Sequence, residues 1–320
     1  MKQLSYTVRF LTPAFLGNAD QIGQWRTPPF KALLRQWWRV AVAPEMKFDT
    51  DAIRKREGEL FGVAADSGGS RKSQVRIRLG HWDEGTLNQA PRIGDVSLGK
   101  NQIPAALYSG YGPIMTGPRL KARAAIQSGA ETQLHIAFPE NACIEEAICL
   151  MNAYGTAGGR SRNGWGSFEL EGEKTDVPVF AHDWKMAMDL DWPHALGRDE
   201  QGVLIWQSAP QADWEKAMRL LAQARADMRR YVPDRLMLAS PSGTRETLPG
   251  WDKNERVPNS LRFKVRSEGA RFIAVIFHMP CLPADSLMQK LRSHSKQDFI
   301  RCFTKTHEFL DQHSQFQRAK

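Results

Sequence analysis

Two periodicities alternate along the first half of this chain, and their order constrains its fold more than any other feature. Apolar and polar residues alternate over residues 4–10, 74–79 and 132–138, as expected of half-buried strands. Between them, apolar residues recur every three to four positions, which is typical of amphipathic helices. With a last strand at 166–172 ("GSFELEG"), the order is strand, helix, strand, strand, helix, strand. This is the split βαβ order, so we predict an α+β, ferredoxin-like (RRM-like) domain over residues 1–175.

The second half repeats this arrangement. Residues 203–206 are strand-like, and a helix rich in cations is expected over 214–228. Two further strands are expected at 261–266 and 271–279, before a mostly helical end. We therefore predict a second ferredoxin-like domain over residues 176–320, in tandem with the first.

Positive charge is in excess, with 44 Lys and Arg against 35 Asp and Glu and a formal net charge of +9. This balance favours a polyanionic partner, and nucleic acid is the first candidate. A helix is expected after Thr27, as its N-cap, with Pro28 at its first position. On this helix Lys31, Arg35 and Arg39 recur every four residues and form a column on one side. The column is either a solvated basic face or a contact with RNA.

Further candidate RNA contacts lie before this helix and in the second half of the chain. Over residues 261–266, apolar residues alternate with cations that include Arg262 and Lys264, so we expect one apolar and one cationic face. Residues 74–79 show the same pattern. Arg26 completes this set.

The segment "GTAGGRSRNGWGSFEL", residues 155–170, interleaves five glycines with two arginines and a tryptophan. In a split βαβ fold, glycines here would let the backbone approach a ligand closely and expose N–H groups to phosphate oxygens. The arginines would add positive charge, whereas the tryptophan side chain either stacks on a base or packs into the adjacent hydrophobic core. The candidate RNA-contacting residues are Gly158, Gly159, Arg160, Arg162, Gly164 and Trp165.

Cysteine spacing and hydropathy exclude several classes of protein. The four cysteines form no CxxC pair and no Cys/His spacing suited to zinc, so we expect no metal site and no disulfide framework. We also expect no cofactor. The first residues lack the apolar core of a signal peptide. The most apolar run, residues 272–277, is too short to span a bilayer. We expect a cytoplasmic protein with no membrane partner.

Several segments carry a family resemblance. "RTPPFKALLRQWWRV", "GELFG" followed by "GGSRKSQVRIRL", the glycine-rich segment and "RVPNSLRFKV" resemble, in this order, motifs of the RAMP (repeat-associated mysterious protein) superfamily of CRISPR systems. The double tryptophan and "ELFG" are most similar to the first subunit of Cmr-type (type III-B) effector complexes. The chain departs from the family pattern at Ala32, where a glycine is usual, and at Asn259 and Ser260, where Ser-Pro is usual.

The resemblance implies a non-catalytic RNA-binding subunit at the end of a type III-B ribonucleoprotein complex in antiviral defence. Such a subunit holds the 3′ part of the guide RNA and its duplex with target RNA, beside other Cmr-type subunits. The sequence is compatible with this role, because it places cations on strands and loops and has few pairs of titratable residues. Such an arrangement suits binding of an RNA backbone better than catalysis.

Two alternatives remain open. RAMP relatives that process guide RNA use a histidine near the first helix, but the first histidine here is His81. Relatives that cut target RNA use an aspartate near the first strand, and Asp20 is the weak candidate by position, although a turn residue is the simpler interpretation. The other alternative is a scaffold that binds only protein. Salt-dependent RNA binding would exclude the scaffold, and RNA cleavage would indicate the endoribonuclease.

Overall fold

The computed structural model divides this chain into two compact units. It describes residues 1–66, 69–117, 119–173, 180–190, 192–232, 234–240, 248, 250–257, 259–291 and 294–319. Unit 1 consists of Met1–Pro91, Gly110–Phe180 and Lys264–Ser267, and unit 2 of Arg92–Ser109, Ala181–Phe263 and Glu268–Lys320. The boundary predicted between residues 175 and 176 lies outside the described residues. The two-domain prediction did not anticipate that residues 92–109 group with unit 2 and 264–267 with unit 1.

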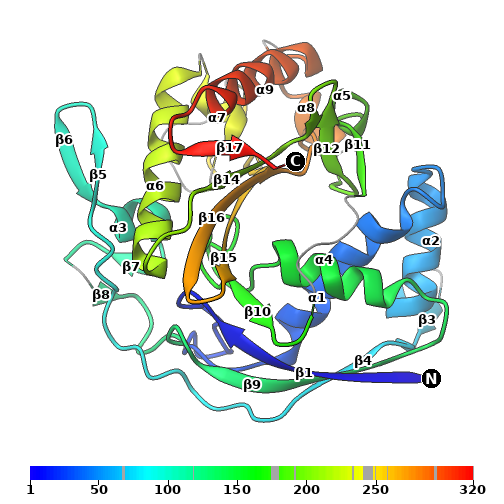
Figure 1. The fold of residues 1–320 in the computed structure, drawn as a ribbon. Coiled ribbons are helices and arrows are strands. Elements are labelled where there is room, and N and C mark those ends of the chain that lie inside the picture. The colour runs from blue at the N-terminus through cyan, green and yellow to red at the C-terminus, as the bar shows by residue number, and fades with distance from the viewer. Residues whose placement is uncertain are drawn as a thin grey trace. The chain divides into compact units, whose positions relative to one another are not determined.

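Unit 1 contains a four-stranded antiparallel sheet in the order β10-β1-β9-β4. Its strands are β1 (Lys2–Phe10), β4 (Arg76–Leu79), β9 (Glu131–Phe138) and β10 (Phe168–Leu170). Helices α1 (Thr27–Val42) and α4 (Ile144–Tyr154) lie side by side on one face of this sheet (Figure 1). The chain order β1, α1, β4, β9, α4, β10 is the order of strands and helices that the sequence predicts.

Helix α1 buries the apolar stripe that its sequence predicts. Phe30, Leu34 and Trp37 are fully buried. The helix begins one residue earlier than predicted, because Arg26 is the N-cap and Thr27 is the first helical residue. Prolines are tolerated in this first turn, where the N–H groups have no partner within the helix.

Aromatic rings join this helix to the sheet. The Phe10 ring centroid lies 4.9 Å from that of Trp25 and 6.2 Å from that of Phe168. The Phe30 and Phe168 centroids are 5.7 Å apart in an edge-on arrangement. Such ring pairs add to the stabilisation from burial alone, so the core of unit 1 sits between α1 and the middle of the sheet.

Smaller elements connect the main ones in unit 1. Helix α2 (Thr50–Phe61) packs against α1 and is capped by the Asp49 side chain, which accepts hydrogen bonds from the N–H groups of Asp51 and Ala52. The others form two short ladders: β2 (Val63–Asp66) with β3 (Gly69–Arg71), and β7 (Ile114–Met115) with β8 (Arg119–Leu120).

A second four-stranded sheet has the order β15-β16-β14-β17. Its strands are β14 (Ile205–Ser208), β15 (Leu261–Glu268), β16 (Arg271–His278) and β17 (Phe316–Arg318), and α6 (Trp214–Tyr231) and α9 (Lys296–Asp311) are its long helices. The remaining elements of unit 2 are short: β5 (Asp95–Leu98), β6 (Asn101–Pro104), α3 (Ala105–Gly110), which ends in unit 1, β11 (Ala181–Asp183), α5 (Trp184–Ala187), β12 (Leu196–Asp199), β13 (Gly202–Val203), α7 (Arg235–Leu238) and α8 (Asp285–Met288). The predicted helical end of the chain is α9, and the sequence analysis did not predict the final strand β17. Within the described ranges, no helix combines the length and the apolarity that a membrane span needs.

Strand β15 differs from its sequence pattern. The alternation over residues 261–266 predicts an exposed cationic face, but residues 261–265 are all buried. Arg262 is 8% exposed and Lys264 is not exposed at all. The prediction of an exposed cationic face is wrong for these two residues, because both side chains are buried.

Candidate nucleic-acid interface

The glycines that follow α4 allow unit 1 to pack tightly on itself. Gly158 has φ +100°, and a Cβ placed on it would lie 2.8 Å from the carbonyl oxygen of Phe15. A Cβ on Gly166, with φ +67°, would lie 1.9 Å from the oxygen of Ala157. The N–H of Gly159 donates to the Phe15 oxygen at 2.9 Å. These glycines permit a close crossing of two chain segments, and the Gly159 N–H is already engaged in it.

Trp165 and Gly164 belong to the interior. The Trp165 side chain has no exposed surface, and its ring centroid lies 5.4 Å from that of Phe15. The Gly164 carbonyl accepts a hydrogen bond from the Thr12 hydroxyl at 2.9 Å. Of the two interpretations of Trp165, packing into the core is the one that agrees with its position.

Arg160 is the predicted contact whose surroundings point most clearly to an anion. The residue has φ +56° and is half-buried. Its guanidinium packs over Gly112, where a Cβ would lie 3.2 Å from Nη2. Burial alone lowers its pKa, and no described residue forms an ion pair or side-chain hydrogen bond with it. A half-buried cation without a carboxylate is stabilised when an anion binds beside it.

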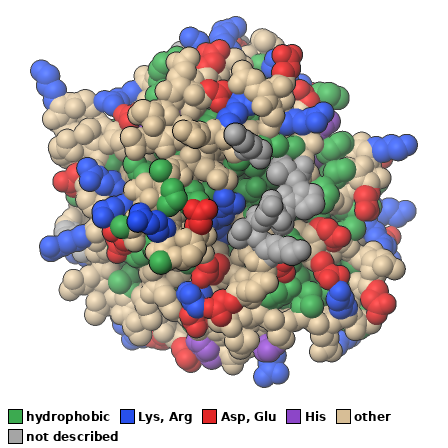
Figure 2. Space-filling model, viewed as in Figure 1, with side chains coloured by type: hydrophobic (Ala, Val, Ile, Leu, Met, Phe, Trp, Pro, Cys, Tyr) green, Lys and Arg blue, Asp and Glu red, His purple; other side chains and the backbone are tan. Residues whose placement is uncertain are grey.

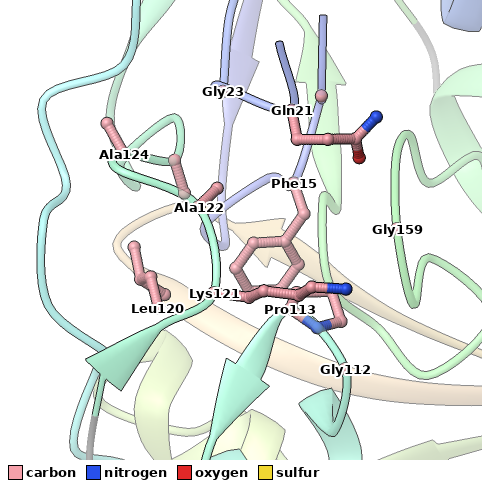
Figure 3. Close-up of a pocket in the computed structure, with 12 residues that line it drawn as sticks. Phe15, Gln21, Gly23, Gly112, Pro113, Leu120, Lys121, Ala122, Ala124 and Gly159 are labelled. Carbon is pink, nitrogen blue, oxygen red and sulfur yellow. The ribbon is translucent and has the colours of Figure 1, made fainter. Parts of the chain in front are cut away.

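Beside Arg160 lies a cavity of about 410 Å³ (Figure 3). Its lining residues are Phe15, Gly17, Gln21, Gly23, Gly112, Pro113, Leu120, Lys121, Ala122, Ala124, Ala125 and Gly159. They include one cation, Lys121, and no carboxylate. Backbone hydrogen bonds hold the walls together, from the Gly23 N–H to the Ala124 oxygen at 3.0 Å and from the Lys121 N–H to the Pro113 oxygen at 2.8 Å.

The basic column on α1 is partly neutralised. Arg35 and Arg39 both form ion pairs with Glu57 of α2, whose carboxylate is 2% exposed. The Arg39 Nη2 also donates to Glu57 Oε1 at 2.7 Å. Lys31 has no such carboxylate partner among the described residues, and burial together with Arg35 lowers its pKa. Two of the three predicted contacts therefore tie α1 to α2.

Lys264 is also held by the protein itself. Its ammonium donates to the carbonyl oxygens of Asn152, Gly155 and Phe168 at 2.5, 2.8 and 2.9 Å. Burial lowers the pKa of Lys264 well below its usual range. An ammonium has three donors, so these carbonyls use all of them and leave none for phosphate.

The other predicted site residues are dispersed. Arg26 donates from Nη1 to the carbonyl of Gly17, a residue that lines the cavity. Arg162 is exposed, and Arg262 is buried in unit 2. Asp20 lies in an exposed turn, where its N–H donates to Asn18 Oδ1 at 2.9 Å, which agrees with the turn interpretation.

Two exposed aromatic side chains of unit 1 escaped the sequence analysis. Tyr111 and Trp82 are each 59% exposed, and Tyr111 directly precedes Gly112 at the cavity. Single aromatic residues in loops carry no periodic signal that separates them from core residues.

Figure 2 shows Lys and Arg side chains gathered at the left of the face in view, with acidic side chains scattered over it.

Comparison with known proteins yields likeness in structure only. No protein-family model and no curated protein matches the chain. A chain of type III-B Cmr-beta bound to cognate target RNA and AMPPnP, in the presence of ssDNA, matches with a TM-score of 0.51 and 11% identity, over 95% of this chain and 98% of that one. This chain has the fold of a type III-B Cmr-beta chain.

Two further solved structures of the same kind are similar. Cmr1 from Pyrococcus furiosus, in its apo form, matches with a TM-score of 0.46 and 13% identity over 95% of this chain and 96% of that one. Type III-B Cmr-beta bound to cognate target RNA matches with a TM-score of 0.49 and 10% identity over 93% and 98%. The fold shared with the Cmr-beta chain at a TM-score of 0.51 agrees with the resemblance that the sequence motifs indicate.

Of the predicted contacts, the structure brings Gly158, Gly159 and Arg160 to the edge of the cavity. The candidate interface also includes Lys121, Gln21 and Phe15, which were not predicted. The loops that carry them have no periodicity, so only the folded backbone places them together.

Proposed function

We propose that this chain is a non-catalytic RNA-binding subunit of a type III-B CRISPR effector complex that acts in antiviral defence. In this role it holds the 3′ part of the guide RNA and its duplex with target RNA, beside other Cmr-type subunits. The observation that carries the proposal is Arg160, a half-buried guanidinium beside a cavity of unit 1 that has no carboxylate partner in the part of the chain that the structure describes. A further support is that a chain of the same fold occurs in Cmr-beta bound to target RNA.

We also propose that the two units are ferredoxin-like domains in tandem. The four strands of the sheet in unit 1 and helices α1 and α4 follow the order β1, α1, β4, β9, α4, β10. The four strands of the second sheet and helices α6 and α9 follow the order β14, α6, β15, β16, α9, β17. In each sheet the first strand lies between the third and the fourth. The same βαββαβ order and the same strand order support a repeat of one domain type.

The proposed binding is mainly to the RNA backbone. Arg160, Lys121 and Lys31 offer charge without a carboxylate partner among the described residues. Phosphate contacts of this kind do not distinguish sequences. The exposed rings of Tyr111 and Trp82 are suited to stacking on unpaired bases, which is also tolerant of sequence.

Fluorescence anisotropy with labelled single-stranded RNA across a salt series tests this function. We expect the wild-type protein to bind several unrelated RNAs with similar affinity, and to bind all of them more weakly as salt rises. Arg160→Ala should weaken binding to all of them equally and reduce the salt slope by about 0.7. The matched control is Arg301→Ala, which removes an exposed arginine paired with Asp298 in α9 of unit 2.

Two results would contradict the proposal. Wild-type protein that binds no RNA at low salt would favour the protein-binding scaffold. An Arg160→Ala variant with wild-type affinity and salt slope would remove Arg160 from the interface. Purification of the tagged chain from its host, followed by identification of bound RNA and companion proteins, tests the partners.

A further inference from the structure

We propose that the cavity beside Gly159 holds one unpaired base of a bound RNA strand, with the adjoining phosphate at Arg160 and Lys121. This inference rests on the proposed RNA binding and adds what the site recognises. A surface that binds only the RNA backbone needs only charge, whereas this site combines charge with an open cavity whose lining is mainly apolar.

The walls of the cavity suit the faces of a base. Phe15, Pro113 and Leu120 supply apolar surface, and the Phe15 ring lies in the middle of the view in Figure 3. Base rings bind well against aromatic and apolar side chains, because their own faces are apolar. The volume of about 410 Å³ is in the usual range for small-molecule sites and too small for a duplex.

Small residues keep this space open. Ala122 and Ala124 line it with side chains of a single methyl group. Gly23 lines it too, and because a Cβ there would lie 2.6 Å from the Ala124 oxygen, this glycine permits the close backbone approach that forms the wall. The backbone bonds between Gly23 and Ala124 and between Gly159 and Phe15 fix opposite parts of the wall. The cavity is thus formed before a ligand arrives, which lowers the entropic cost of binding.

One polar side chain of the lining can contact the edge of a base. Gln21 is exposed, and no described residue forms a hydrogen bond with its side-chain amide. In Figure 3 the Gln21 amide and the Lys121 ammonium both extend toward the side on which Gly159 lies. An amide offers a donor and an acceptor together, which is the combination that base edges present.

The charge of the site distinguishes a nucleotide from an apolar ligand. Arg160 packs over Gly112, a residue of the lining, and Lys121 is itself part of it. Neither cation has an acidic partner among the described residues, and no carboxylate lines the cavity. Two cations beside a space for one base match a nucleotide with its phosphate outside.

The experiment compares two RNA probes of equal length and charge. One is a fluorescein-labelled single-stranded 20-mer, and the other is the same strand with abasic ribose at every position. We expect wild-type protein to prefer the base-containing strand by roughly tenfold or more, which is the range for stacking of one to a few bases. Ala122→Leu, which fills the cavity without changing charge, should reduce this preference severalfold and leave the salt slope unchanged. The control Ala212→Leu changes an exposed alanine of unit 2 and should retain the full preference.

A second measurement does not depend on a variant. RNA that contains 4-thiouridine is crosslinked to the wild-type protein, and crosslinked peptides are identified by mass spectrometry. Crosslinks within residues 15–23, 112–113, 120–125 or 159–160, which line or adjoin the cavity, support the inference, and crosslinks confined to other segments overturn it. An Ala122→Leu protein that keeps the wild-type preference also overturns it.

Two further outcomes separate this inference from the proposed function. Wild-type protein that binds both strands equally retains RNA binding but contradicts the base site, whereas absence of binding to either strand contradicts the proposed function itself. If AMP or UMP alone binds the cavity tightly enough to displace RNA at micromolar concentration, the occupant is a free nucleotide, and the assignment to an RNA strand is wrong.

Discussion

Replacement of Lys264 by methionine separates a structural role from the RNA contact that the sequence predicts. The side chain is fully buried, and its ammonium donates to carbonyl oxygens of Asn152, Gly155 and Phe168. Asn152 lies in the last turn of α4 and Gly155 is its C-cap, so Lys264 satisfies carbonyls that have no partner within the helix. A cation at this end also interacts favourably with the helix dipole.

The expected loss follows from these contacts. Each hydrogen bond contributes about 1 kcal/mol net, so removal of three costs about 3 kcal/mol. The similar size of methionine avoids a large cavity, and relief from burying an ammonium offsets the favourable dipole interaction. For a unit of this size, a loss of about 3 kcal/mol lowers the melting temperature by about 6–12 °C.

Thermal melts followed by circular dichroism measure this effect. The control is Lys55→Met, which changes an exposed lysine of α2 and should shift the melting temperature by less than about 2 °C. RNA affinity of the folded Lys264→Met protein should equal that of the wild type. An unchanged melting temperature together with weaker RNA binding and a salt slope smaller by about 0.7 would refute this reasoning and restore Lys264 as a phosphate contact.

Three further predictions follow from other side chains. Arg39→Ala should lower the free energy of unfolding by about 2–4 kcal/mol, because it leaves the buried Glu57 carboxylate with one partner fewer. Lys31→Ala should leave the melting temperature unchanged and weaken RNA binding, and equal losses of melting temperature in both variants would contradict this. Burial lowers the pKa of His307 to about 3, below its value in the unfolded chain. The contribution of the neutral imidazole to stability is therefore complete above about pH 6.5, and up to about 1.4 kcal/mol is lost per pH unit as the pH falls toward 3. His307→Phe should flatten the pH dependence of the melting temperature, and an unchanged pH profile would contradict this. Asp20→Ala should leave target-RNA fragments from the assembled complex unchanged, and loss of one specific cut at normal assembly would favour the endoribonuclease.

Strands and helices could be predicted from the sequence because each depends on a local period. Alternation over residues 132–138 and the apolar stripe of α1 correspond to β9 and to a helix that buries Phe30, Leu34 and Trp37. The order of these elements also agrees with the observed strands and helices of unit 1. The cap of α1 was misplaced by one residue, since a threonine before prolines can be either cap or first helical residue.

The candidate site could be predicted only in part. The glycine-rich segment and Arg160 were identifiable from composition, but the same composition also suggested Trp165, which is buried in the core. Phe15, Gln21 and Lys121 could not be predicted, because they come from loops whose spatial proximity depends on the folded chain.

The sequence by itself determined where strands and helices form and which residue types could meet RNA, because backbone periodicity and charge are local properties. Only the tertiary structure decided which cations are available. It pairs Arg35 and Arg39 with Glu57 and surrounds Lys264 with carbonyls, whereas no carboxylate of the described residues pairs with Arg160. The physical reason is that the state of a charge depends on burial and on partners distant in sequence, and neither is encoded in the residues beside it.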